Sequence, residues 1–274
     1  MRGRRALLPV LMAVGVLLTV AARAEPDDPL RRALDRSRAA IGRLVPDLAF
    51  RDADGRPFRL TQLRGRPYLL TFVYTACSSV CPTLVQNLAP IVADAHANLG
   101  PGRFAVVVVG FDVARDDPAA MRAFARRQGV RDPDWHFLAG DPATVTALTE
   151  AVGFTFLPSA GGFQHLAQVT LVDADGRIVR QIHGDVFSPP QIVEPLKDVV
   201  LGRDRPVRDL GDLVDRIRLW CTVYDPASGR YYFDYSLFIG LAIGAASLAL
   251  VATVLWREWR RAGGHRRSTT GGLS

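Results

Sequence analysis

The chain has 274 residues, of which 49% are hydrophobic, and a formal net charge of +7 at pH 7. This charge suggests a nucleic-acid partner, but all of it lies at the two ends: +3 within residues 1–5 and +4 in the segment after Trp256. The residues between the two ends are formally neutral, which excludes a basic nucleic-acid-binding surface.

The N-terminus has the pattern of a secretory signal. A basic start precedes an apolar stretch from Ala6 to Ala22, and Ala24 ends a small-residue cleavage site. We interpret residues 1–24 as a signal peptide, or as an uncleaved anchor because the apolar stretch is long for a cleaved signal. Either version exports the domain that follows. Residues 25–44 form an Arg-rich lead segment, helical or irregular.

Residues 45–202 alternate strand patterns with helical patterns. A hairpin turning at Asp54-Gly55 comes first, and an apolar strand, RPYLLTFVYT, follows it. The later elements are a helix after Cys81, a buried strand over 104–113, a helix stopped at Gly129, a strand over 135–140, a helix capped by Asp141, a hairpin over 165–184 and a last helix over 188–201. This order predicts a three-layer α/β domain.

The C-terminal part carries a membrane signal. Residues 203–235 form a juxtamembrane linker, and the segment from Ser236 to Trp256 is uncharged over about twenty residues, enough for a transmembrane helix. Arginines in residues 257–274 place this basic tail in the cytoplasm by the positive-inside rule. The main domain is therefore expected to be periplasmic, or in an equivalent extracytoplasmic space.

Cys77 and Cys81 are the most informative residues, because they follow a buried strand directly and open a helix. Pro82 fits the first helical turn. The helix dipole and the unpaired N–H groups there lower the pKa of thiols, and a thiolate is both a nucleophile and a metal ligand. Two thiols at this spacing close a disulfide or chelate a soft metal ion. The spacing alone leaves both readings open, together with a static structural disulfide.

A Cys-x-x-x-Cys-Pro motif after an aromatic-rich strand is formed by Cys77, Cys81 and Pro82. A distant His165 opens a strand eight residues before Asp173, which begins an Asp-x-x-Gly turn. With these two features the chain resembles the Sco family, also called SenC or PrrC. Members are thioredoxin-like, membrane-tethered copper proteins that help assemble the copper centre of cytochrome oxidase subunit II.

The resemblance runs from about Pro46 to Leu201 and implies a thioredoxin-like fold with copper, Cu(I) or Cu(II), bound by Cys77, Cys81 and His165. Two thiolates and one imidazole suit Cu(I), and they hold Cu(II) if another ligand joins. The implied role is that of a metallochaperone rather than an enzyme. The implied partners are cytochrome c oxidase subunit II or a similar copper-receiving protein, and a thiol reductant or copper donor.

Two other functions compete with this one. In a periplasmic thiol-disulfide oxidoreductase, Cys77 attacks a substrate disulfide and Cys81 resolves it, without any need for His165. A peroxide-reducing enzyme needs an activated Cys beside an Arg or similar donor, and the sequence shows no such local signature. The membrane anchor lies after the domain, which departs from the commonest family layout. Cys221, followed by a YDPxxGxY pattern before the terminal helix, resembles a bacterial subgroup of Sco-like proteins.

Several single residues are secondary candidates. Asp112 ends a buried strand at the sheet edge where the thiols lie, and it is a candidate for tuning them. Cys221 has three readings: a third or resolving thiol, an intermolecular bridge, or an unreactive residue. His96 and His136 are interpreted as parts of an exposed helix face and a strand start, and His183 as surface polar with a minor role beside the site.

Overall fold

The computed structural model describes residues 28–159, 161–201, 222–226 and 230–265. The chain divides into two units, Met1–Arg203 and Asp204–Ser274, which are taken separately below. The segment interpreted as a signal peptide and the candidate Cys221 lie outside the described residues.

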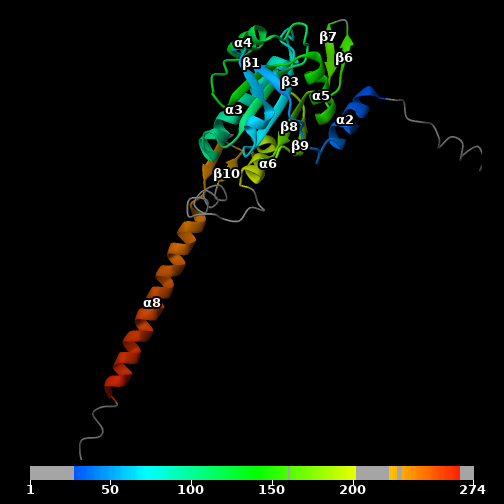
Figure 1. Cartoon of the computed structure of the whole chain (residues 1–274). Helices are drawn as coiled ribbons and strands as arrows, with labels where there is room; N and C mark the ends of the chain where they lie inside the picture. The colour runs from blue at the N-terminus through cyan, green and yellow to red at the C-terminus, as the bar shows by residue number, and fades with distance from the viewer. Residues whose placement is uncertain (1–27, 160, 202–221, 227–229, 266–274) are drawn as a thin grey trace, which may run out of the picture. The chain divides into compact units, whose positions relative to one another are not determined.

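A seven-stranded mixed sheet forms the centre of the first unit, in the order β2-β1-β5-β4-β3-β8-β9 (Figure 1). Its strands are β1 Ala49–Asp52, β2 Pro57–Arg59, β3 Tyr68–Val73, β4 Ala105–Gly110, β5 Trp135–Ala139, β8 Gln168–Val172 and β9 Ile178–His183. The middle strands β3, β4 and β5 are parallel, and the outer pairs are antiparallel. All residues of β3, β4 and β8 are buried, which explains why these strands are predominantly apolar.

The helices cover this sheet from both sides (Figure 1). Their bounds are α2 Pro29–Ala39, the 3-10 turn η1 Leu60–Leu63, α3 Val80–Leu99, α4 Pro118–Arg127, α5 Pro142–Val152 and α6 Pro189–Leu201. Helix α3 packs on α6, and its Gln86 hydrogen-bonds Gln128 beside α4. Helix α2 approaches the end of α5 at Gly153 and bonds β9 through Ser37 and His183. The expected layers of helix, sheet and helix are confirmed.

Most elements agree with the expectations from the sequence. The hairpin β1–β2 turns at Asp54-Gly55, and the Asp141 carboxylate caps α5 by accepting the backbone N–H of Thr144 at 2.9 Å. Gly129 follows α4 with a positive φ of 72°, which only glycine adopts readily. Local turn and cap chemistry therefore placed these boundaries correctly.

One hairpin was not expected. Strand β6, Phe156–Ser159, pairs with β7, Gly162–His165, as a separate two-stranded sheet. His165 therefore ends β7, and the expectation that it opens the next long strand is wrong. The sequence did not predict this hairpin because Pro158 and two successive glycines interrupt the run, and proline and glycine are uncommon inside strands.

The second unit holds a short hairpin and a long helix. Strand β10, Thr222–Asp225, pairs antiparallel with β11, Arg230–Phe233, within the residues interpreted as a linker. Helix α8, Ser236–His265, starts where the transmembrane segment was predicted and continues beyond Trp256. An 18-residue window within Ser236–Arg260 has a mean hydropathy of 2.3, so this helix is long and apolar enough to cross a membrane. The domain boundaries drawn from the sequence remain predictions.

Candidate metal centre

The two thiols lie where β3 gives way to α3. After Val73, the backbone N–H of Cys77 donates to the carbonyl of Tyr74 at 3.0 Å, which forms a turn before the helix. Cys81 is the second residue of α3, and its N–H donates to Sγ of Cys77 at 3.4 Å. The Cys77 sulfur thus takes the place of a helix cap, because it accepts one of the N–H groups that the first turn leaves unpaired.

The two thiols have opposite electrostatic environments. Burial acts to raise the pKa of Cys77, but hydrogen bonds from the backbone N–H groups of Cys81 and Ser79 outweigh it, and the pKa is lowered from its ordinary value. Cys81 is only 1% exposed, and burial raises its pKa strongly. The expectation that the helix start lowers both pKa values is therefore right for Cys77 and wrong for Cys81, because desolvation dominates at the buried thiol.

His165 reaches the thiols from the β6–β7 hairpin. Its Nε2 lies 4.0 Å from Sγ of Cys81, although 84 residues separate them in the chain. Its other ring nitrogen, Nδ1, is buried and has no hydrogen-bond partner within the described part of the chain. Burial lowers the pKa of His165 below its ordinary value of 6.5, so the imidazole is neutral near pH 7 and keeps a lone pair for a ligand.

Aromatic rings surround the histidine. The ring of Phe111, which follows β4, lies 5.4 Å from that of His165, and Phe154 lies 5.5 Å from it. Tyr74 packs edge-on against both Phe111 and Phe163 and hydrogen-bonds Cys77 through its hydroxyl. A Cβ at position 162 would lie 2.8 Å from the Tyr74 hydroxyl, so this approach requires Gly162. The apolar wall limits water around the donors.

Asp116 is a site residue that the sequence reasoning missed. Its Oδ1 accepts the backbone N–H and the hydroxyl of Thr75 at 2.8 and 2.7 Å, and its Oδ2 accepts the N–H of Asp112 at 2.9 Å. The carboxylate is 2% exposed and holds the loop that leads to Cys77. The candidate Asp112 instead faces Arg115, 4.0 Å away. No sequence signal singled out Asp116, because it lies beside the helix cap Asp117.

The other candidates lie elsewhere. His183 bonds Ser37 at 2.8 Å, between β9 and α2. His136 stacks near Phe58 on β5, and His96 belongs to a charged cluster treated below. The expectation of an exposed His96 is wrong, since it is 9% exposed.

A groove of about 300 Å³ opens beside His165. Leu30 and Ala33 of α2 form one side of it, and Leu157 and Gln164 of the β6–β7 hairpin form the other. The imidazole is therefore accessible from one direction, while aromatic rings enclose it on the others.

Two thiols, one half-buried and one buried, lie at the start of a helix beside a histidine from the β6–β7 hairpin. Together with the α/β fold they define the chain as a thioredoxin-like dithiol protein. The sequence profile of the SCO1/SenC family matches residues 38–201. This match covers more than half of the chain, and the protein belongs to the SCO1/SenC family.

Individual relatives agree with this assignment. A Stutzerimonas stutzeri protein provisionally named as copper-binding is 27% identical over 154 residues, 54% of this chain and 71% of its own. The crystal structure of Arabidopsis thaliana ScoI with copper bound aligns with a TM-score of 0.50 and 17% identity, covering 57% of this chain and 95% of its own. BsSco, a member of the Sco family of cytochrome c oxidase assembly proteins studied for a disulfide switch, aligns with a TM-score of 0.52 and 20% identity, covering 58% of this chain and 94% of its own. The two structures share the fold, which confirms the expected thioredoxin-like class.

Proposed function

We propose that this protein is a membrane-anchored copper metallochaperone that binds copper through Cys77, Cys81 and His165 for assembly of the copper centre of cytochrome c oxidase. The observation that carries the proposal is the approach of the His165 Nε2 to the Cys81 Sγ, at 4.0 Å. Bonds of about 2.3 Å to sulfur and 2.05 Å to nitrogen, as at zinc, separate the two donors by about 3.8 Å at a trigonal angle. The copper-binding relative, the copper-bound ScoI and BsSco, an oxidase assembly protein, support the same cargo and pathway.

The donors suit Cu(I). Thiolate and imidazole are soft ligands, and three of them give a low-coordinate site. Cys77 supplies a thiolate readily because its pKa is lowered, whereas Cys81 loses its proton only when the metal charge replaces it. Copper binding therefore releases a proton from Cys81. Delivery would proceed by exchange of thiolate ligands with a client, without release of a free ion.

The placement of the domain follows from the anchor. A helix apolar over Ser236–Arg260 holds the protein in a membrane, and the arginines after Trp256 favour a cytoplasmic tail. The dithiol domain would then face the periplasm or an equivalent exterior space. There a dithiol stays reduced only if a reductant or a bound metal protects it.

Titration of the reduced full chain in detergent with Cu(I), anaerobically and against a competing chelator, tests the proposal. One copper per chain is expected, lost in Cys77→Ser and in Cys81→Ser and weakened in His165→Ala. His183→Ala, at a histidine that bonds Ser37 instead, is the matched control and should bind as the parent does. Copper affinity that does not change in either serine variant would overturn the proposal.

A thiol-disulfide oxidoreductase is a second candidate, and the opposite pKa shifts of the two thiols favour it. The Cys77 thiolate would attack a client disulfide and release one client thiolate. Cys81 would then lose its proton and attack the Cys77 sulfur, closing the Cys77–Cys81 disulfide and freeing the reduced client. Two electrons pass to the client, and an external thiol reductant resets the pair. A chain that cycles in this way but does not compete for Cu(I) would have this function.

A further inference from the structure

A second group of ionisable side chains lies at the end of α3 away from the thiols. Cys81 is in the first turn of this helix and His96 in its last, so fifteen residues (81 to 96) separate them by roughly 22 Å along the axis. Asp132 and Asp134 approach His96 from the segment that leads into β5. This cluster therefore belongs to a different edge of the sheet from the candidate copper site.

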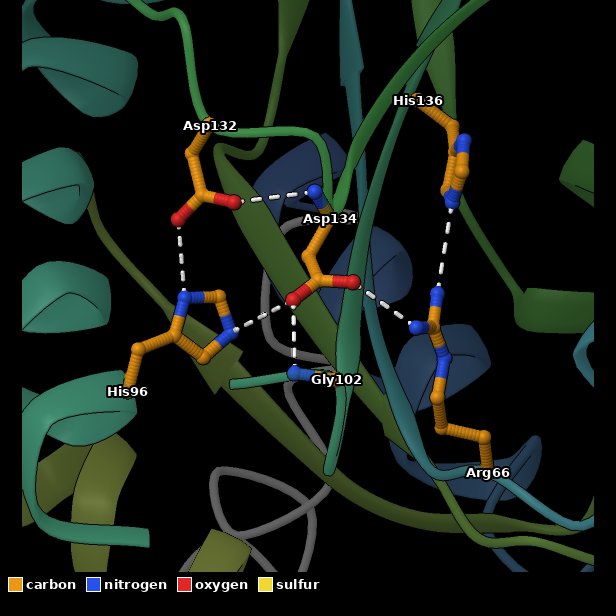
Figure 2. Close-up of polar contacts among 6 residues, drawn as sticks. All are labelled: Arg66, His96, Gly102, Asp132, Asp134 and His136. Carbon is orange, nitrogen blue, oxygen red and sulfur yellow. Dashed lines mark hydrogen bonds and ion pairs between the residues drawn. The ribbon is translucent and has the colours of Figure 1, made fainter. Parts of the chain in front are cut away.

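The first carboxylate sets the tautomer of the histidine. Asp132 Oδ2 lies 2.8 Å from His96 Nδ1, a hydrogen-bond distance at which an ionised carboxylate accepts the ring N–H (Figure 2). In a neutral imidazole the other nitrogen, Nε2, then carries the lone pair. The other Asp132 oxygen accepts the backbone N–H of Asp134 at 2.9 Å, so the ring and both carboxylates are held in one arrangement.

The lone pair of His96 Nε2 has no hydrogen-bond partner among the residues that the structure describes, although the residue is 91% buried. It faces Oδ2 of Asp134 at 3.7 Å, too far for a hydrogen bond (Figure 2). Asp134 meanwhile accepts from Arg66 at Oδ1 and from the N–H of Gly102 at Oδ2, and a carboxylate oxygen has room for one more partner. Two electron-pair donors face each other across a gap, which costs free energy unless a cation lies between them.

The gap has the width that a metal ion needs. Metal bonds of about 2.05 Å to imidazole nitrogen and 2.1 Å to carboxylate oxygen place these donors about 3.4 Å apart at the tetrahedral angle and about 3.7 Å apart at 125°. The Asp132–His96 pair reproduces the carboxylate–histidine arrangement that supports metal-bound histidines. Two carboxylates and one guanidinium also leave the cluster one net negative charge, which attracts a cation.

We propose that His96 Nε2 and Asp134 Oδ2 bind a divalent first-row transition-metal ion, with Asp132 orienting the imidazole and water completing the coordination. A nitrogen ligand favours such an ion over Ca²⁺ or Mg²⁺, which prefer oxygen ligands throughout. The Asp132 side chain is 32% exposed, so hydrated ions reach the cluster from solvent. This second site would hold a different class of metal from the sulfur site, because it has no thiolate.

Zn²⁺ titration of the full chain in detergent, with all three cysteines replaced by serine to remove sulfur ligands, tests the proposal by calorimetry. One Zn²⁺ per chain is expected. Asp132→Asn should weaken its affinity by about 10–100-fold, the usual effect of losing a carboxylate that orients a ligand. Asp134→Asn should abolish it. Asp35→Asn, the same change at an exposed position of α2, is the matched control and should leave binding unchanged.

Nitrogen-15 NMR of the His96 ring in the same cysteine-free chain gives a second readout. It needs no asparagine substitution, so it can be used even if an asparagine variant fails to fold. Zn²⁺ is expected to shift Nε2 and to leave Nδ1 protonated. The proposal is overturned if the cysteine-free chain binds no Zn²⁺, or if Asp134→Asn binds it as tightly as its parent. An imidazolium that bridges both carboxylates and ignores added Zn²⁺ would also overturn it.

Discussion

The two ends of helix α3 hold buried ionisable side chains in different surroundings. At its start, Cys77 and Cys81 lie beside aromatic rings, and both oxygens of the buried Asp116 carboxylate accept hydrogen bonds from backbone or hydroxyl donors. At its end, His96 is held among charged groups, with Asp132 and Asp134 as its partners. One helix thus separates a soft, apolar donor set from a hard, charged one.

This difference shows how a single scaffold supports two donor chemistries. At the thiol end, desolvation raises the pKa of Cys81 and backbone N–H groups lower that of Cys77, and both effects depend on excluding water. The polar end tolerates water, because hydrogen bonds orient its ligands directly. Substitutions at the thiol end should therefore act through packing and pKa, and those at the polar end through charge.

The largest effect is expected from Phe111→Ala, at the thiol end. Phe111 is 2% exposed and contacts Tyr74, Phe154 and His165. Loss of the Phe111 ring should lower the free energy of unfolding by about 3–5 kcal/mol. It should also weaken copper binding, because the cavity left by the ring no longer holds the His165 imidazole in place. Denaturant unfolding followed by near-ultraviolet circular dichroism measures the free energy of unfolding. Phe163→Ala, at a half-buried ring of the same cluster, should cost less, and an equal loss would contradict the packing argument.

Asp116→Asn should have the next largest effect. The amide offers one acceptor in place of two, so a hydrogen bond to Thr75 or to Asp112 is lost, at a cost of about 1–3 kcal/mol. Asp112→Asn is the matched control and should change the unfolding free energy by less than about 1 kcal/mol, since its ion-pair partner Arg115 is 71% exposed and 4.0 Å away. If Asp112→Asn cost more, Asp112 rather than Asp116 would support the thiol loop.

The asymmetry of the thiols predicts more than about a tenfold difference in alkylation rate. Thiolate is the reacting form, and the pKa of Cys77 is lowered from 9.0 while that of Cys81 is raised. The rate of Cys77 should therefore reach half its maximum below pH 9.0, and that of Cys81 above it. Iodoacetamide trapping at a series of pH values, read by mass spectrometry, measures both rates. Equal rates would remove the basis for assigning attack to Cys77.

Arg66→Gln, at the polar end, is expected to have the smallest effect. Burial, and then the charge of Arg66, lower the pKa of His136 from 6.5. As the pH falls, the unfolded chain therefore protonates His136 before the folded chain does. His136 then reduces the stability of the folded state between pH 6.5 and its lower folded-state pKa. Removing Arg66 should raise the folded-state pKa of His136, which NMR titration of His136 detects. The pH range over which His136 reduces stability should then become narrower. A His136 pKa that stays the same or falls would show that burial alone sets it.

Local sequence chemistry was enough to predict most of the fold. The run before Cys77 is apolar for the length of a strand, and Asp141 with Pro142 marks a helix start in any surroundings. The β6–β7 hairpin was missed because Pro158 and adjacent glycines suggest a loop. Its pairing depends on contact with Tyr74 and Phe111, which lie far away in the chain.

The candidate site divides in the same way. The Cys-x-x-x-Cys-Pro motif predicted the reactive thiols and the family resemblance, and the uncharged segment from Ser236 predicted the membrane anchor. Both could be predicted from the sequence because each is a pattern of neighbouring residues. The opposite pKa shifts of the two cysteines, the support from Asp116 and the grouping of His96 with Asp132 arise from burial and from contacts between distant residues. Neither burial nor such contacts can be read from residue order, since they exist only once the strands and helices have packed.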